Sequence, residues 1–137
     1  MVESNLNILL KNLNPRIVDG RYHFASVDPG QIMTLANYLG YITAIFREDE
    51  GLTVVFLEDI LSDMSQITDK TVGPFSLITL HVQSDLMSIG LLAKLTNELA
   101  KNNISVNAYS AYYHDHLFVP YDLRENALAI LTKINHS

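Results

Sequence analysis

The side chains best placed to do chemistry in this sequence are His114 and His116, which flank Asp115. On an extended segment, side chains two positions apart lie on the same face, so both imidazoles could bind one metal ion. A stable zinc site needs at least a third ligand, and the neighbouring sequence supplies none at suitable spacing. Three interpretations stay open: a polar hairpin tip with hydrogen-bonded histidines, a contact to a bound ligand, or part of a metal site. We favour the first and predict no metal or other cofactor.

Motifs of common enzyme classes are absent from the sequence. It contains no Gly-rich phosphate loop, nucleophile elbow or metalloprotease pattern. Because there is no cysteine, it also lacks a thiolate nucleophile and a Cys-based zinc site. Nine Lys and Arg are spread thinly against fifteen Asp and Glu, whereas a nucleic-acid binder needs concentrated positive charge. We therefore predict a protein that is not an enzyme and binds no nucleic acid.

The sequence gives no sign of a membrane or secretory protein. No apolar run approaches the roughly 20 residues that span a bilayer. The segment "MVESNLNILLKNL" lacks the basic start and small-residue cleavage site of a signal peptide. We expect a cytoplasmic protein without a membrane partner.

Residues 1–72 are predicted to form one half of the protein, with a leading helix over about residues 5–13 capped by Ser4. "RIVDGRYHFASV" favours a β-hairpin that turns at Asp19-Gly20. Asp28-Pro29-Gly30 then opens a short helix, because Asp caps a helix and Pro suits its first turn. Two strands, "YITAIF" and "LTVVFL", and a helical segment over residues 58–64 follow.

Residues 73–137 are predicted to form the other half, since "SQITDKTVGP" before it lacks apolar periodicity. A strand over residues 75–83 precedes a helix capped by Ser84, with Gly90 inside that helix. A β-hairpin and a final helix to about residue 134 complete this half. The helix is expected to turn Leu86, Ile89, Leu92, Ala93 and Leu99 inward and to leave Leu91 and Leu95 outside.

The order of elements indicates an α+β protein. Each half approximates the ferredoxin-like βαββαβ unit, with an antiparallel sheet and helices packed on one face. A fourth strand is missing after the second helix of each half. "RIVD", near residue 16, could supply one for the other half.

Residues 82–120 resemble the ACT domain, a small ligand-sensing module, and residues 27–56 resemble a fainter copy. The chain is similar to a mainly bacterial family of tandem ACT-domain proteins, with two ACT-like halves at 1–72 and 73–137. Four segments carry the resemblance: "DGRYHFASV", "FREDEGLTVVF", "ITLHVQSDLMSIGL" and "NISVNAYSAYYHDHLFVP".

The resemblance implies a site for a small molecule, often an amino acid, where the loop after the first strand enters the first helix. In this chain the corresponding residues are Asp28, Pro29 and Gly30 in one half, and Gln83, Ser84, Asp85 and Gly90 in the other. Free backbone N–H groups at a helix start suit a carboxylate, and Asp85 could meet an ammonium group. The second loop lacks Pro-Gly and the first helix is short, so the two sites need not both function.

We therefore expect a non-catalytic regulatory or sensor protein that binds a small molecule such as an amino acid. The alternative is a protein–protein interaction or assembly module without a small ligand. We also expect a homodimer, because a two-fold contact is the commonest way to bury a self-complementary patch. The side chains expected to form that patch are Phe75, Leu77, Thr79, His81, Leu91 and Leu95.

Overall fold

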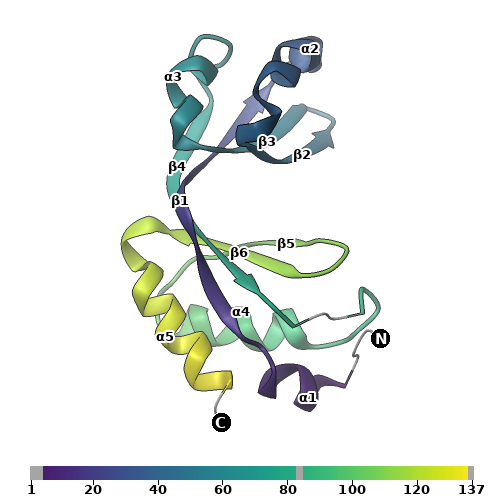
Figure 1. The fold of residues 1–137 in the computed structure, drawn as a ribbon, viewed down its shortest axis with the longest axis vertical. Helices are drawn as coiled ribbons and strands as arrows, with labels where there is room; N and C mark the ends of the chain where they lie inside the picture. The colour runs from purple at the N-terminus through teal and green to yellow at the C-terminus, as the bar shows by residue number, and fades with distance from the viewer. Residues whose placement is uncertain (1–4, 83–84, 136–137) are drawn as a thin grey trace. The chain divides into compact units, whose positions relative to one another are not determined.

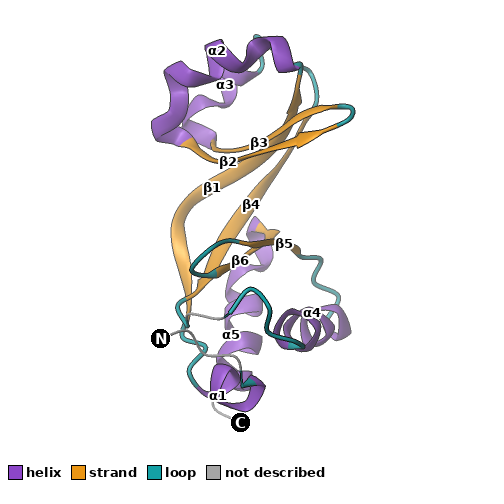
Figure 2. Ribbon diagram, turned by 90° about the vertical axis from the view of Figure 1, so that its right-hand side faces the viewer, coloured by secondary structure: helices purple, strands orange, loops and turns teal. Residues whose placement is uncertain are grey.

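The computed structural model describes residues 5–82 and 85–135, which form an α+β protein with strands in the order β2-β3-β1-β4-β6-β5 (Figures 1 and 2). The assigned strand pairs are antiparallel. The chain divides into two compact units, one of residues 20–75 and the other of residues up to 19 together with those from 76 onward. The predicted fold class is confirmed.

The unit of residues 20–75 is a complete βαββαβ arrangement. Its elements are β1 (Pro15–Val27), η1 (Pro29–Gln31), α2 (Ile32–Leu35), η2 (Ala36–Tyr41), β2 (Ile42–Glu48), β3 (Gly51–Leu57), η3 (Glu58–Ile60), α3 (Leu61–Met64) and β4 (Thr71–Leu80). Figure 2 shows α2 and α3 over the same face of β2 and β3. The core of this unit forms where the helical segments pack on β3. It includes Leu35, Ile60 and Met64 from the helical segments and Val54 and Phe56 from β3.

The other unit holds the larger core. Its elements beyond parts of β1 and β4 are α1 (Leu6–Lys11), α4 (Leu91–Lys101), β5 (Asn107–Ser110), β6 (Asp115–Pro120), η4 (Tyr121–Leu123) and α5 (Arg124–Asn135). Ile78 and Leu80 of β4 and Leu117 of β6 meet apolar side chains of all three α-helices in one buried cluster. Asn5 caps α1 by accepting hydrogen bonds from the Asn7 and Ile8 amides. Ser4, the predicted cap, lies outside the described residues.

The predicted hairpin at Asp19-Gly20 is wrong, because Pro15–Val27 is one continuous strand. Gly20 has a φ of 112°, but the chain runs on through it without reversing. The strands β1 and β4 are neighbours in the sheet, and hydrogen bonds flank their pairing at both ends. The Ser26 amide donates to the carbonyl of Lys70, just before β4, and the amide of His81, just after β4, donates to the carbonyl of Asn14, just before β1. A hairpin and a bent long strand share the same residue pattern, and only the partner strand distinguishes them.

The long strands β1 and β4 explain the origin of the fourth strand that each predicted half lacked. Both β1 and β4 cross the division between the units, so each unit receives a strand from each of them. "RIVD" thus belongs to the unit formed mainly by residues 76–137, the role considered for it from sequence. The compact units therefore differ from the predicted division between residues 72 and 73, since residues up to 19 group with the C-terminal segment.

The predicted register of the helix in the second half is also wrong. Gly90 is not inside the helix but precedes it, with a φ of 96°, and α4 begins at Leu91. Leu99 is buried as predicted, but Leu86 and Ile89 are exposed. Leu91 and Leu95 face the core instead of the outside. The reason is that residues 85–88 form a turn, which delays the helix and rotates its apolar stripe.

The apolar patch predicted for the homodimer changes accordingly. Leu91 and Leu95 are buried, and so are Leu77 and Thr79 of β4. Phe75 is half-buried, which leaves His81 as the exposed member of the predicted set. A self-association surface on this protein must therefore be sought among other residues.

Candidate functional site

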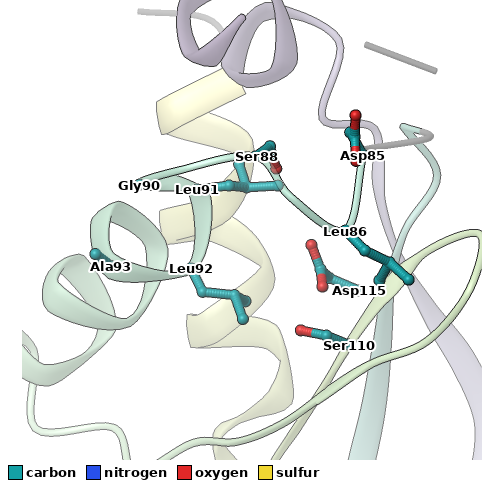
Figure 3. Close-up of a pocket in the computed structure, with 9 residues that line it drawn as sticks. All are labelled: Asp85, Leu86, Ser88, Gly90, Leu91, Leu92, Ala93, Ser110 and Asp115. Carbon is teal, nitrogen blue, oxygen red and sulfur yellow. The ribbon is translucent and has the colours of Figure 1, made fainter. Parts of the chain in front are cut away.

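A pocket of about 180 Å³ lies where the loop after β4 enters α4, beside the end of the β5–β6 hairpin (Figure 3). Each of three segments contributes to its wall. The lining residues are Asp85, Leu86, Ser88 and Gly90 of the loop, Leu91, Leu92 and Ala93 of α4, and Ser110 and Asp115 of the hairpin. All of them belong to the unit that contains residues 76 onward.

Asp115 is the most enclosed polar group of this pocket, with 8% of its surface exposed. It is the first residue of β6 and pairs with Ser110, the last residue of β5. Residues opposite each other in an antiparallel pair lie on one face, so both polar side chains reach the pocket together. Figure 3 shows them extending from the hairpin toward the start of α4. Asp115 therefore places a nearly enclosed carboxylate at the wall of the pocket.

Asp85 fixes the shape of the loop that closes the pocket. Its Oδ1 accepts a hydrogen bond of 2.8 Å from the Met87 amide, and its carbonyl accepts one of 2.9 Å from the Ser88 amide. These bonds make residues 85–88 a turn, a common role of Asp in loops. The turn places a second carboxylate at the pocket without burying it.

The start of α4 brings the opposite partial charge to the same pocket. Gly90 is the N-cap residue and has no side chain that could accept hydrogen bonds from the first-turn amides. The first N–H groups of a helix lack partners within it and carry the positive end of the helix dipole. Leu91, Leu92 and Ala93 of this turn line the pocket. The site therefore combines carboxylates on one side with backbone N–H groups on the other.

The backbone conformation at this cap explains why the residue is a glycine. A φ of 96° is strained for any residue with a side chain. A Cβ at position 90 would also lie 3.3 Å from Leu6 Cδ2, a close contact with the leading helix. Gly90 thus ends the loop and opens the helix without a side-chain cap of its own.

The loop of the other half is built differently. Asp28, Pro29 and Gly30 are all exposed. The Asp28 Oδ1 accepts a 2.7 Å hydrogen bond from the Gly30 amide and so caps η1, which has three residues. This carboxylate is used by its own backbone, at the start of a very short helical turn.

The histidine pair lies apart from the pocket-lining residues. His114 Nδ1 donates a hydrogen bond of 3.3 Å to the Val82 carbonyl, and His116 Nδ1 is 2.9 Å from Thr79 Oγ1. In residues 5–82 and 85–135, no three His, Asp or Glu side chains are grouped so that they could hold a metal ion. The metal interpretation thus finds no third ligand in that part of the chain.

Of the site residues expected from sequence, the structure brings Asp85 and Gly90 together at the pocket. Gln83 and Ser84 lie outside the described residues, and the Asp28 loop belongs to the other unit. Ser110 and Asp115 were not predicted for the site. The available signal was strand alternation, which places Asp115 on the face opposite to His114 and His116.

Comparison with known proteins identifies the family to which this chain belongs. Residues 2–65 and residues 72–133 each match the ACT domain. A Vibrio cholerae protein of unknown function, described as a possible transport protein, shares 35% identity over 95% of both chains, with a TM-score of 0.77. The chain belongs to the ACT-domain family, as a protein of two tandem ACT domains. No curated protein matches it.

More distant structures share the fold. An Agrobacterium tumefaciens protein is 22% identical over 88% of this chain and 87% of its own, with a TM-score of 0.67. The regulatory subunit of aspartate kinase from Thermus flavus is 10% identical over 88% of this chain and 95% of its own, with a TM-score of 0.65. Among the described residues, no helix has the length and apolar character needed to cross a membrane.

Proposed function

We propose that this protein is a non-catalytic regulatory protein that binds a free amino acid in the pocket between α4 and the β5–β6 hairpin. The observation that carries the proposal is that Asp115 and Asp85 line one pocket with the first turn of α4, whose N-cap Gly90 supplies no side-chain cap. A free amino acid bears an ammonium group for the carboxylates and a carboxylate for the helix N–H groups. A volume of about 180 Å³ suits a small molecule.

The family supports this role without naming the ligand. Both halves match the ACT domain, and a structure with the same fold is the regulatory subunit of aspartate kinase. The regulation of aspartate kinase is a property of that subunit and is not assigned to this chain. For this chain we propose the general role, in which ligand binding changes the interaction with a regulated partner.

Thermal denaturation with a panel of the common amino acids tests the proposal. A ligand at 100 times its dissociation constant adds about 2.7 kcal/mol of stability, which for a protein of this size raises Tm by roughly 10 °C. The amino acid with the largest effect is then compared with its deaminated and decarboxylated analogues. We expect both analogues to be weak, because each lacks one of the two charged groups. The absence of any shift across the panel would contradict the proposal.

The competing function is an interaction module without a small ligand. It is favoured by the exposed Met87, Ile89, Tyr112 and Tyr113, large apolar or aromatic side chains in the loop and hairpin turn that flank the pocket-lining residues. Contiguous exposed apolar surface often marks a protein interface. The amino-acid panel separates the two functions, since an interaction module should show no zwitterion-dependent shift.

We also propose that the protein forms a homodimer through the unit of residues 20–75. Strand β2 stands at the end of the strand order, and Phe46 on it is 62% exposed. An edge strand with exposed apolar side chains is prone to pair with another chain. Light scattering at micromolar concentration should give about twice the chain mass of 15.4 kDa. We expect Phe46→Asp to give monomers and Met87→Asp, in the other unit, to leave the mass unchanged. A wild-type monomer would overturn the proposal.

A further inference from the structure

Three histidines form a cluster on one side of the unit that holds the pocket. His81 follows β4, His114 lies in the β5–β6 turn, and His116 lies in β6. The ring centroids of His81 and His114 are 5.6 Å apart, and those of His114 and His116 are 6.4 Å apart. Hydrogen bonds to the Val82 carbonyl and to Thr79 Oγ1 hold two of these rings against the end of β4. The three imidazoles therefore act as electrostatic neighbours in a fixed arrangement.

The same short segment connects this cluster to the pocket. Asp115 stands between His114 and His116, and strand alternation directs it to the opposite face, where it lines the pocket with Ser110. The Ala111 amide donates a hydrogen bond of 3.0 Å to the His114 carbonyl and closes the turn. A displacement of the imidazoles would thus be transmitted through the backbone to the Asp115 carboxylate.

The charged and titratable neighbours of the cluster come from each adjacent strand. They are Arg16 of β1, His81 after β4, Tyr109 of β5, which pairs with His116, and Asp115 of β6. Partial desolvation lowers the pKa of His81, which is otherwise exposed, and Arg16 and His114 lower it further. Burial also lowers the pKa of His116, as do His114 and His81, whereas Asp115 raises it. The two imidazoles are consequently neutral at neutral pH and gain charge as the pH falls below the ordinary histidine range.

We propose that the cluster of His81, His114 and His116 is a pH-sensitive device that reshapes the amino-acid pocket. On acidification the imidazolium groups repel one another and Arg16, and this repulsion displaces the turn that carries Asp115. The added positive charge also opposes an ammonium group at that carboxylate. Affinity for an amino acid therefore falls as the pH falls. This last consequence rests on the proposed function, whereas the change in the pocket does not.

NMR spectroscopy of the ligand-free protein tests the device. The pH is lowered from about 7.5 to about 5.0, because the lowered pKa of His81 and His116 requires a range that extends well below the ordinary histidine pKa. This range stays above the ordinary pKa of carboxyl groups. The imidazole signals of the three histidines are followed together with the backbone amides of Ser88, Gly90 and Leu92 at the pocket. We expect these amides to shift with the same midpoint as His116. The amide of Gly40, in the other unit, serves as the reference and should not follow them.

Two variants make the test specific. In the double variant His114→Gln/His116→Gln, the pH-dependent shifts at Ser88, Gly90 and Leu92 should be lost. In His81→Gln, loss of one positive neighbour should move the midpoint of His116 upward, and the pocket amides should move with it. Pocket amides that stay constant while the imidazoles titrate would overturn the proposal. Because no ligand is added, that result would not contradict the proposal of amino-acid binding. Conversely, an amino-acid panel without any Tm shift would not contradict the pH-dependent change in the pocket.

Discussion

Replacement of Leu95 by alanine is expected to lower the free energy of unfolding by about 2–5 kcal/mol, as is usual for a fully buried leucine. Leu95 is 0% exposed and lies in the core where α4 meets α1, α5 and the strands. The shortened side chain loses its transfer free energy and leaves a cavity that the surrounding helices can close only in part. Urea denaturation followed by circular dichroism measures the effect.

A matched control separates this helix register from the one that the sequence favours. Ile89, which precedes the helix, is 86% exposed, so Ile89→Ala should change the stability by less than about 0.5 kcal/mol. In the register predicted from sequence, Ile89 would be in the core and Leu95 outside it. A larger loss from Ile89→Ala than from Leu95→Ala would therefore show that the helix begins before Gly90.

The start of α4 shows why an apolar pattern alone did not fix this register. Leucine, methionine and isoleucine occur on several helical faces of residues 86–99, so more than one stripe can be drawn through them. What decides between them is Gly90, whose positive φ stops the helix from extending toward Asp85. A glycine in a helical pattern can lie either inside a helix, which it destabilises, or at the helix boundary. The backbone angle that distinguishes these two positions cannot be predicted from the sequence.

The ferredoxin-like arrangement was predictable because each strand–helix–strand segment is local. The sharing of β1 and β4 was not, since pairing between segments far apart in the sequence, such as Ser26 with Lys70, leaves no local pattern. Asp19-Gly20 looked like a hairpin turn because that dipeptide favours positive φ. In the folded chain Gly20 adopts a positive φ of 112°, but the strand continues through it.

The pocket was predictable only on one side. The loop after β4 could be placed at a helix start, which brought Asp85 and Gly90 into consideration. Asp115 was not predicted as a site residue because the prediction considered the chemistry of its neighbours, His114 and His116, which lie on the other face of the strand. Ser110 could not be predicted as a site residue, because its pairing with Asp115 depends on the position of the hairpin turn. Both residues reach the site through strand register, which the sequence does not state.

Asp115→Asn is expected to weaken the binding of the amino acid that most raises Tm by at least about 30-fold. The change keeps the shape of the side chain but removes its charge, and loss of one partner from a buried charged pair costs about 2 kcal/mol or more. Asp115 is 8% exposed, so water screens such a pair only weakly. Isothermal titration calorimetry gives the dissociation constant, and thermal denaturation without ligand verifies that the variant is folded.

Two further aspartates make this prediction decisive. Asp122 lies at an exposed position of η4, so Asp122→Asn removes the same charge from the protein without touching the pocket and should leave the affinity unchanged. Asp28→Asn alters the loop after β1 and should also leave it unchanged, because Asp28 belongs to the other unit and is not a lining residue of this pocket. Loss of binding in Asp28→Asn with normal binding in Asp115→Asn would move the site to the unit of residues 20–75. Wild-type affinity in all three variants would exclude the Asp115 carboxylate from ligand recognition.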